Sequence, residues 1–270
     1  MSRKEQGFTL IELSIVLVII GLIVGGILVG QDLIKASEIR AAVAQIEKYN
    51  SAVNTFRGKY NGLPGDLTSE KASSFGFVAR VGTTGQGDGN GLIEGNGGTN
   101  TNMVFTQEAG MFWNDLSVAS LIDGNFTTNA ANQNSAGAGG NVPAVTLTNV
   151  PAVFPLARMG RGNYITVGST GGSNYWLIAG ISGVTAVTGA YSMAANMTPI
   201  EAYNIDIKVD DGMPNTGAVQ QHGTSASTTA AFTDNGDAAC ISGNTSADTY
   251  IRTITAGGNQ PNCILRLRFN

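Results

Sequence analysis

The sequence is poor in the side chains that most enzymes and metal sites require. Its 270 residues include two cysteines and one histidine, His222, which leaves little material for a metal cage or a hydrolytic triad. Charged residues make up 13% of the chain, about half of the usual share. With 15 Lys and Arg against 19 Asp and Glu, the net charge of −4 excludes a wholesale basic surface for nucleic acid. A non-enzymatic protein is therefore favoured, with His222 as a solvated loop residue.

One long apolar run dominates the N-terminal part of the chain. It extends from Phe8 to Gly30, and as a helix it would measure about 35 Å, enough to cross a hydrocarbon core of about 30 Å. Arg3 and Lys4 precede the run, so the positive-inside rule keeps the N-terminus in the cytoplasm and sends the chain after residue 30 outward. We therefore expect a membrane helix followed by an extracytoplasmic head.

A carboxylate, Glu12, interrupts the apolar run. Within a membrane such a group costs at least about 2.5 kcal/mol and needs a partner. A cut between Gly7 and Phe8 would supply one, because the new amine of one subunit could neutralise Glu12 of a neighbour and fix the axial register of packed helices. The alternatives are a secretory signal cut near Gly26 or Gly30, and a signal anchor with a chance glutamate, which leaves the Gly7–Phe8 junction unexplained.

Residues 4–13, with the sequence KEQGFTLIEL, resemble the class III leader and processing site of type IV pilins and type II secretion pseudopilins. The resemblance implies that a prepilin peptidase cuts after Gly7, that Phe8 becomes the N-methylated terminus, and that Glu12 acts in assembly. It also implies a ladle-shaped pilin fold. The chain departs from many pilins in one respect, since its membrane run contains glycines and no proline.

A single helix of about fifty residues is predicted after the leader, which comprises residues 1–7. Residues 8–30 form its transmembrane and assembly half. Residues 31–61 form an amphipathic half, in which apolar residues recur at intervals of three and four residues. Glycine and proline directly after Asn61 end the helix. Residues 62–270 form the extracytoplasmic head. The predicted class is α+β and pilin-like, with the long helix packed on a globular head that carries an antiparallel β-sheet.

Within the head, several short elements are predicted from local patterns. An apolar face indicates a helix from Thr106 to Asp123, and residues 125–149 are a low-complexity loop. Residues 163–167 and 175–179 read as neighbouring antiparallel strands. Residues 198–212 are ambiguous between helix and strand. A capping residue followed by proline favours the helix.

Both cysteines, Cys240 and Cys263, lie in the exported part of the chain, so a disulfide is predicted. A free thiol pair or half of a metal site are the alternatives. The bridge would pin the segment around Cys240 to a C-terminal strand. In pilins a C-terminal disulfide of this kind bounds the exposed, variable region, which the resemblance implies here.

Two acidic clusters offer oxygen ligands that calcium would accept. The first combines Asp88, Asn90 and Glu94, but it lacks the ligand spacing of an EF-hand, which favours an ordinary turn. The second, on the helical segment, contains three aspartates for which Lys208 offers a simpler salt-bridge role. Its members are Asp206, Asp210 and Asp211. No cofactor is therefore predicted, with calcium as the alternative.

The predicted function is that of a structural subunit of a type IV pilus or a type II secretion pseudopilus. Its partners would be other pilins in a homo- or hetero-polymer, a prepilin peptidase and an inner-membrane assembly platform, with no nucleic acid. The precursor would lie in the inner membrane before joining a cell-surface pilus or a periplasmic pseudopilus. The alternatives are a membrane-anchored monomeric adhesive or binding domain and an anchored enzyme.

Overall fold

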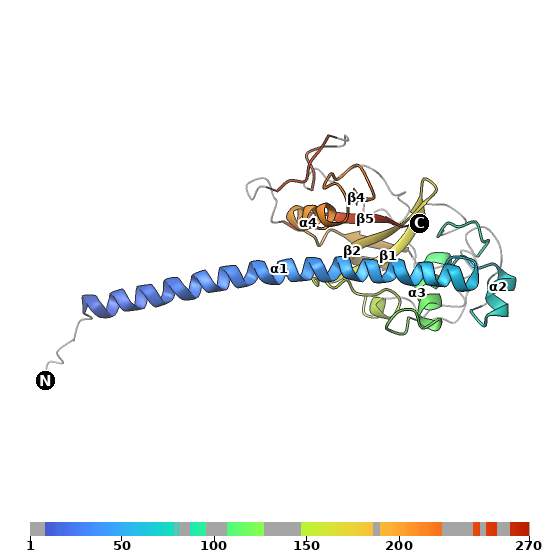
Figure 1. Ribbon diagram of the computed structural model, residues 1–270, viewed down its shortest axis with the longest axis horizontal. Helices are drawn as coiled ribbons and strands as arrows, with labels where there is room; N and C mark the ends of the chain where they lie inside the picture. Colours follow the sequence, from blue (N-terminus) through green and yellow to red (C-terminus); the bar gives the residue numbers. More distant parts are fainter. Residues whose placement is uncertain are drawn as a thin grey trace.

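A long helix projects from a compact head (Figure 1). The computed structural model describes residues 9–78, 80, 87–95, 107–126, 147–185, 190–222, 240–243, 247–252 and 260–269. The first described residues lie far from the head, and the last described residues lie within it (Figure 1). The predicted α+β class, with a long N-terminal helix and an antiparallel sheet, is confirmed.

The long helix, α1, extends without interruption from Leu10 to Tyr60. It ends at Asn61, whose left-handed backbone (φ 52°) is a conformation that asparagine tolerates and that closes a helix. Its described side chains before Ile39 are not buried, whereas those from Ile39 onward alternate between buried and exposed as the head covers one face. The buried residues are Ile39, Ala42, Ile46, Tyr49, Ala52, Val53, Phe56 and Tyr60.

The described part of the head contains three further α-helices and a 3₁₀ turn. They are α2 (Ser69–Ser74), α3 (Gln107–Val118), η3 (Val150–Ala152) and α4 (Pro199–Val209). The prediction of a helix rather than a strand after Thr198 is confirmed. Thr198 and Glu201 form a capping box, in which the Glu201 N–H donates to Thr198 Oγ1 (3.3 Å) and the Thr198 N–H donates to Glu201 Oε2 (2.9 Å).

Helix α3 is shorter than predicted. It ends at Val118, five residues before the predicted end at Asp123, and the predicted first residue, Thr106, lies outside the described residues. Ser120 adopts a left-handed backbone (φ 56°), and the Leu121 N–H returns to the Leu116 carbonyl at 3.0 Å. This bond satisfies a carbonyl group of the last helical turn. The apolar residues that follow pack against the head without continuing the helix.

Among the described residues, the head contains one antiparallel sheet of five strands: β1 (Asn163–Thr170), β2 (Ser173–Thr185), β3 (Ala190–Ala194), β4 (Val219–His222) and β5 (Ile264–Phe269). Their order is β1-β2-β5-β4, and β3 pairs with the last part of β2. The C-terminal strand therefore lies inside the sheet, between β2 and β4.

The hairpin between β1 and β2 is longer than the predicted strands. Both strands continue to a two-residue turn at Gly171 and Gly172, where Thr170 pairs with Ser173. Both glycines have positive φ, 56° and 76°, which is the backbone that a two-residue hairpin turn requires. Residues between the two predicted strands therefore extend the ladder on both sides of this turn.

Aromatic side chains join α1, α3 and the sheet. Trp176 of β2 stacks on Phe269 of β5 with ring centroids 4.2 Å apart, and its Nε1–H donates to Asn50 Oδ1 of α1 at 2.8 Å. Trp113 of α3 contacts both Tyr49 and Trp176, at 4.9 and 5.5 Å. Because aromatic pairs stabilise beyond their buried area, this cluster fixes the helix on the head.

His222 was predicted to be a solvated loop residue, and this prediction is wrong. The residue ends β4, where it pairs with Ile264 of β5, and only 2% of it is exposed. The local sequence is polar, but the pairing with a strand that follows more than forty residues later buries it. Arg266 is likewise buried, and it donates to Gln220 of β4.

The two cysteines form a disulfide in the structure. Cys240 and Cys263, with Cα atoms 5.2 Å apart, are both fully buried. Cys263 directly precedes β5, and its N–H donates to the Met197 carbonyl just before α4. The bridge therefore ties the segment at Cys240 to the place where α4 and the C-terminal strand begin.

Replacing both cysteines with alanine should lower the free energy of unfolding by about 3.5 kcal/mol, because the bridge closes a loop with a sequence separation of 23. Urea unfolding of the detergent-solubilised full chain would measure the loss. A loss below about 1 kcal/mol would contradict a stabilising role for the bridge.

Candidate functional site

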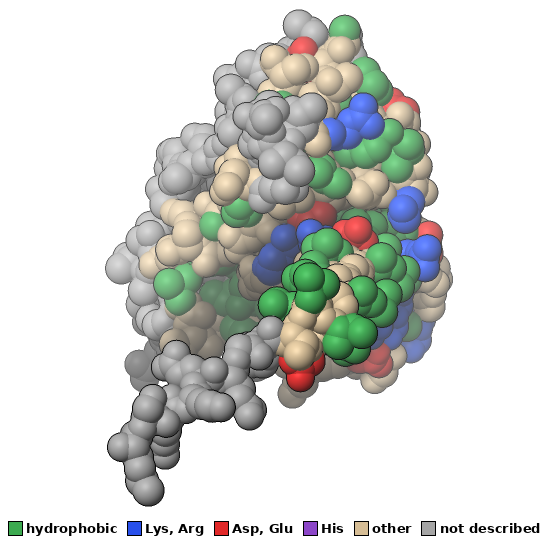
Figure 2. Space-filling model, turned by 90° about the vertical axis from the view of Figure 1, so that its left-hand side faces the viewer, with side chains coloured by type: hydrophobic (Ala, Val, Ile, Leu, Met, Phe, Trp, Pro, Cys, Tyr) green, Lys and Arg blue, Asp and Glu red, His purple; other side chains and the backbone are tan. Residues whose placement is uncertain are grey.

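The projecting part of α1 presents apolar side chains to its surroundings. Every large apolar residue from Leu10 to Ile34 is at least about half exposed. By length and composition this helix could cross a membrane, and it is the one such helix among the residues that the structure describes. Seen from the N-terminal side, apolar side chains cover the projecting helix, while charged side chains lie on the head around it (Figure 2). No other described part of the chain covers this surface.

Glu12 lies in the first turn of this helix, where Thr9 caps it. The Thr9 backbone N–H and Oγ1–H both donate to Glu12 Oε2, at 2.8 and 2.7 Å, and the Glu12 N–H donates to Thr9 Oγ1 at 3.3 Å. The carboxylate thus faces the start of the helix, where two of its own chain's donors partly compensate its charge. The sequence carries a signal for this arrangement, Thr-x-x-Glu before an apolar run. Gly7 and Phe8 lie outside the described residues.

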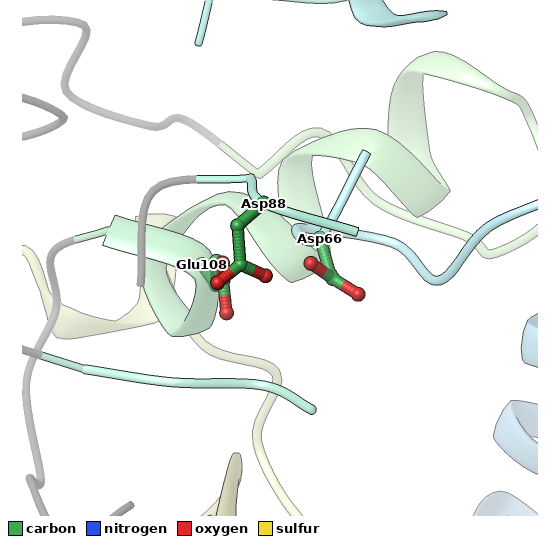
Figure 3. A group of neighbouring side chains, drawn as sticks. All are labelled: Asp66, Asp88 and Glu108. Atoms are coloured by element: carbon green, nitrogen blue, oxygen red, sulfur yellow. The ribbon is translucent and has the colours of Figure 1, made fainter. Parts of the chain in front are cut away.

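A second candidate site is a cluster of three carboxyl groups in the head (Figure 3). Asp66 follows α1, Asp88 lies in a glycine-rich loop, and Glu108 belongs to the first turn of α3. One oxygen from each lies within 4.8 Å of the others. Asp66 and Glu108 are fully buried, and Asp88 is half-buried.

The sequence-predicted calcium ligands are arranged differently. Asn90 Nδ2 donates to Asp88 Oδ2 (3.1 Å) and to Glu94 Oε2 (3.3 Å). The Asn90 amide therefore bridges the two carboxylates by hydrogen bonds, and the three side chains do not converge on a common ion position. Asp66 and Glu108, which do approach Asp88, were not predicted. No short-range signal could have found Glu108, because the turn after α1 and helix α3 meet only in the folded head.

Asp66 binds the glycine-rich loop through both carboxyl oxygens. Oδ1 accepts from the Gly89 N–H and Oδ2 from the Gly91 N–H, each at 2.7 Å. Burial raises the pKa of Asp66 to about 7, more than the two hydrogen bonds lower it, and the charge of Asp88 raises it further.

Glu108 binds the same loop at two other points. Its Oε1 accepts from the Gly87 N–H at 2.8 Å and its Oε2 from the Glu94 N–H at 2.7 Å. Burial, with the charges of Asp66 and Asp88, raises the pKa of Glu108 to about 9. At neutral pH the cluster therefore holds at least one proton unless a cation replaces it.

No lysine or arginine neutralises this cluster in the described part of the head. The ion pairs found there are Lys48–Asp123, Arg80–Asp115 and Arg161–Glu201. Carboxylate oxygens from three segments suit a hard cation such as calcium, and each oxygen retains a lone pair beside its backbone bond. The arrangement can therefore hold either a proton or a cation.

The second predicted acidic cluster has a structural role. Asp206 is buried, where it accepts from Tyr250 Oη (2.8 Å) and the Gly212 N–H (3.0 Å), and burial raises its pKa to about 7. Asp210 and Asp211 are exposed and accept from the loop that leads to β4. The predicted salt bridge with Lys208 is not formed, since no ion pair joins Lys208 to these aspartates in the described chain.

Comparison with known proteins bears on the N-terminal site. The family model for the prokaryotic N-terminal methylation motif matches residues 2–28. The chain carries the prepilin-type signature of type IV pilins and pseudopilins. The match covers the start of α1, including Glu12, and leaves the head unmatched. A search of curated proteins and a search of solved structures returned no significant match. The signature marks a pilin-like or pseudopilin-like precursor with a membrane anchor.

Without divalent cations, the free energy of unfolding should fall as the pH rises from 5 to 9. Asp66 and Glu108 have folded-state pKa values above the ordinary 3.8 and 4.5, so each stabilises the fold fully only at low pH, where it is protonated in both states. This stabilisation is lost as the pH rises through about 7 for Asp66 and about 9 for Glu108. The variant Asp88→Asn removes one charge from the cluster and should reduce this dependence. Thermal unfolding at several pH values would measure it, with the exposed Glu70→Gln as control.

Calcium added at pH 8 should raise the unfolding temperature of the wild type and of Glu70→Gln more than that of Asp88→Asn. Equal pH profiles for all three proteins would contradict the interpretation of the cluster. A pH difference without any calcium response would show that the cluster holds protons only.

Proposed function

We propose that the mature chain is a structural subunit of a type IV pilus or a type II secretion pseudopilus. The single observation that carries this proposal is the prepilin signature at the start of a helix whose apolar surface has no partner among the described residues. A prepilin peptidase would cut after Gly7 and methylate the new N-terminus at Phe8. The proposed precursor lies in the inner membrane with its N-terminus in the cytoplasm and its head outside.

Assembly would exchange lipid for identical helices around α1. Lipid tails are as apolar as leucine, so packing Leu10–Ile34 against other helices gives little hydrophobic gain over the membrane. Specific polar contacts and an assembly platform must therefore drive the exchange. Once outside the membrane, the apolar surface is stable only when neighbouring subunits cover it. The proposed partners are accordingly other pilins, identical or different, and an inner-membrane platform.

The polar contact that sets the register would be made by Glu12. In the single chain, Thr9 supplies the donors to its carboxylate. In the polymer, the Phe8 amine of a neighbour would supply a full positive charge. Residues 8 and 12 are separated by about 6 Å along a helix, so this pair offsets neighbouring parallel helices by about that distance. One pair would thus define the axial step of the assembly.

Intact mass and N-terminal sequencing of the protein from sheared surface material and from membranes would test the proposal. We expect a chain in the sheared fraction that begins at Phe8 and is one methyl group heavier than its sequence. Type II pseudopili remain periplasmic, so the same processed chain in fibres isolated from the periplasm would support the proposal equally. A chain that keeps Met1 and stays in the membrane would contradict the proposal and favour an anchored monomeric adhesive or binding domain.

The variant Glu12→Ala should enter the membrane normally but reduce the amount of assembled fibre by more than about tenfold, because it leaves the neighbouring amine without its buried partner. Immunoblots of sheared and membrane fractions would measure both quantities. Ser14→Ala, two residues away on the same exposed helix, is the matched control and should assemble normally. A normal fibre yield from Glu12→Ala would contradict the register role.

A further inference from the structure

A half-open groove of about 300 Å³ runs between α1 and the segment that follows η3. Its α1 wall includes Ala44 and Lys48, and the opposite wall includes Leu156 and Arg158. Leu156 is 51% exposed, so an apolar side chain lies at the mouth of the groove. The groove lies outside both sites described above.

Gln45 holds the groove in shape. Its Oε1 accepts from the Arg158 backbone N–H at 2.8 Å, and its Nε2 donates to the Leu156 carbonyl at 2.9 Å. These two bonds, both within the chain, fix the second wall to α1 on both sides of Ala157. A partner would therefore meet a preformed surface, which reduces the ordering cost of binding.

The groove carries a net positive charge. Lys48 pairs with Asp123, whereas Arg158 is exposed and forms no ion pair in the described part of the chain. The hydrogen bond and the charge of Lys48 lower the pKa of Asp123, and the charge of Arg158 adds a smaller effect in the same direction. The three groups therefore leave one cation in excess beside the apolar Leu156.

A corner of opposite charge lies on the other side of α1, at the end of α4. Ile207 and Val209 are apolar yet 50% and 43% exposed, and the exposed Asp210 and Asp211 follow them. With Lys208 counted, these groups leave one anion in excess. Figure 1 shows α4 on the opposite side of α1 from α3 and the yellow-green segment that contains η3. Groove and corner thus combine apolar surface with opposite charges.

We infer that the corner at the end of α4 docks into the groove of the next copy of the chain in the assembled fibre. This inference rests on the proposed function. Two different complementary surfaces on opposite sides of one molecule form a head-to-tail contact, which generates open helical polymers when it does not close into a ring. Charge complementarity selects the second copy as the occupant.

The direction of the helix offset agrees with this contact. When Phe8 of one copy lies beside Glu12 of its neighbour, the first copy is displaced about 6 Å toward the head end. Helix α4 lies beside an earlier part of α1 than the η3 segment does (Figure 1). The displacement therefore moves the corner of one copy toward the groove of the next.

Cross-linking tests the contact in intact fibres. The full-length double variant Leu156→Cys with Val209→Cys should give a ladder of disulfide-linked oligomers when sheared fibres meet a mild oxidant. A matched pair, Leu156→Cys with Val118→Cys, uses another exposed apolar residue and should give none. The native cysteines are buried in their own disulfide and leave this readout unaffected. Wild-type-like fibres without a ladder would overturn the inference.

Charge reversal tests the same contact without cysteines. Arg158→Glu makes the groove negative, and Asp211→Lys, at an exposed position, makes the corner positive. Each single variant should reduce fibre yield roughly fivefold, because each places like charges together, and the double variant should recover most of the loss. Arg57→Glu, an exposed arginine elsewhere on α1, is the control. Independent, additive losses from the two changes would overturn the inference. Absence of fibres from the wild type would instead contradict the proposed function, so the two failures are distinguishable.

Discussion

The structure depends on one electrostatic constraint, a carboxylate in the first turn of a helix whose first part is otherwise largely apolar. A charge at that position is costly in hydrocarbon and must be compensated. Within the single chain, Glu12 obtains partial compensation from the Thr9 N–H and hydroxyl. These are neutral donors, so a cationic partner would bind the carboxylate more strongly. The helix therefore combines a surface that suits a membrane with a carboxylate that a cationic partner would bind.

The same helix also carries the head. Beyond Ile39 its apolar face is buried, and Asn50 and Tyr49 join it to Trp176 and Trp113. A shift of α1 along its axis therefore moves the whole head by the same amount. This rigid coupling is why an offset set near Glu12 would decide which head surfaces meet, and why groove and corner can be related to the helix register.

Local sequence patterns predicted the elements that are determined by interactions between residues close in the sequence. A continuous apolar run that changes to apolar residues spaced three and four apart predicted both halves of α1. Thr198-Pro199 with Glu201 predicted α4. Features made by distant segments escaped prediction. His222 is buried because β4 pairs with the C-terminal strand. Asp66 and Glu108 converge because α3 packs beside the turn after α1, and no periodicity encodes that meeting.

The most direct test of the central claim is the structure of the assembled fibre by electron cryomicroscopy. The account predicts that the N-terminal amine of Phe8 in one subunit lies within about 4 Å of the Glu12 carboxylate in a neighbour. It also predicts parallel helices offset by about 6 Å. Fibres in which every Glu12 remains bonded only to its own Thr9, with the amines elsewhere, would contradict the account.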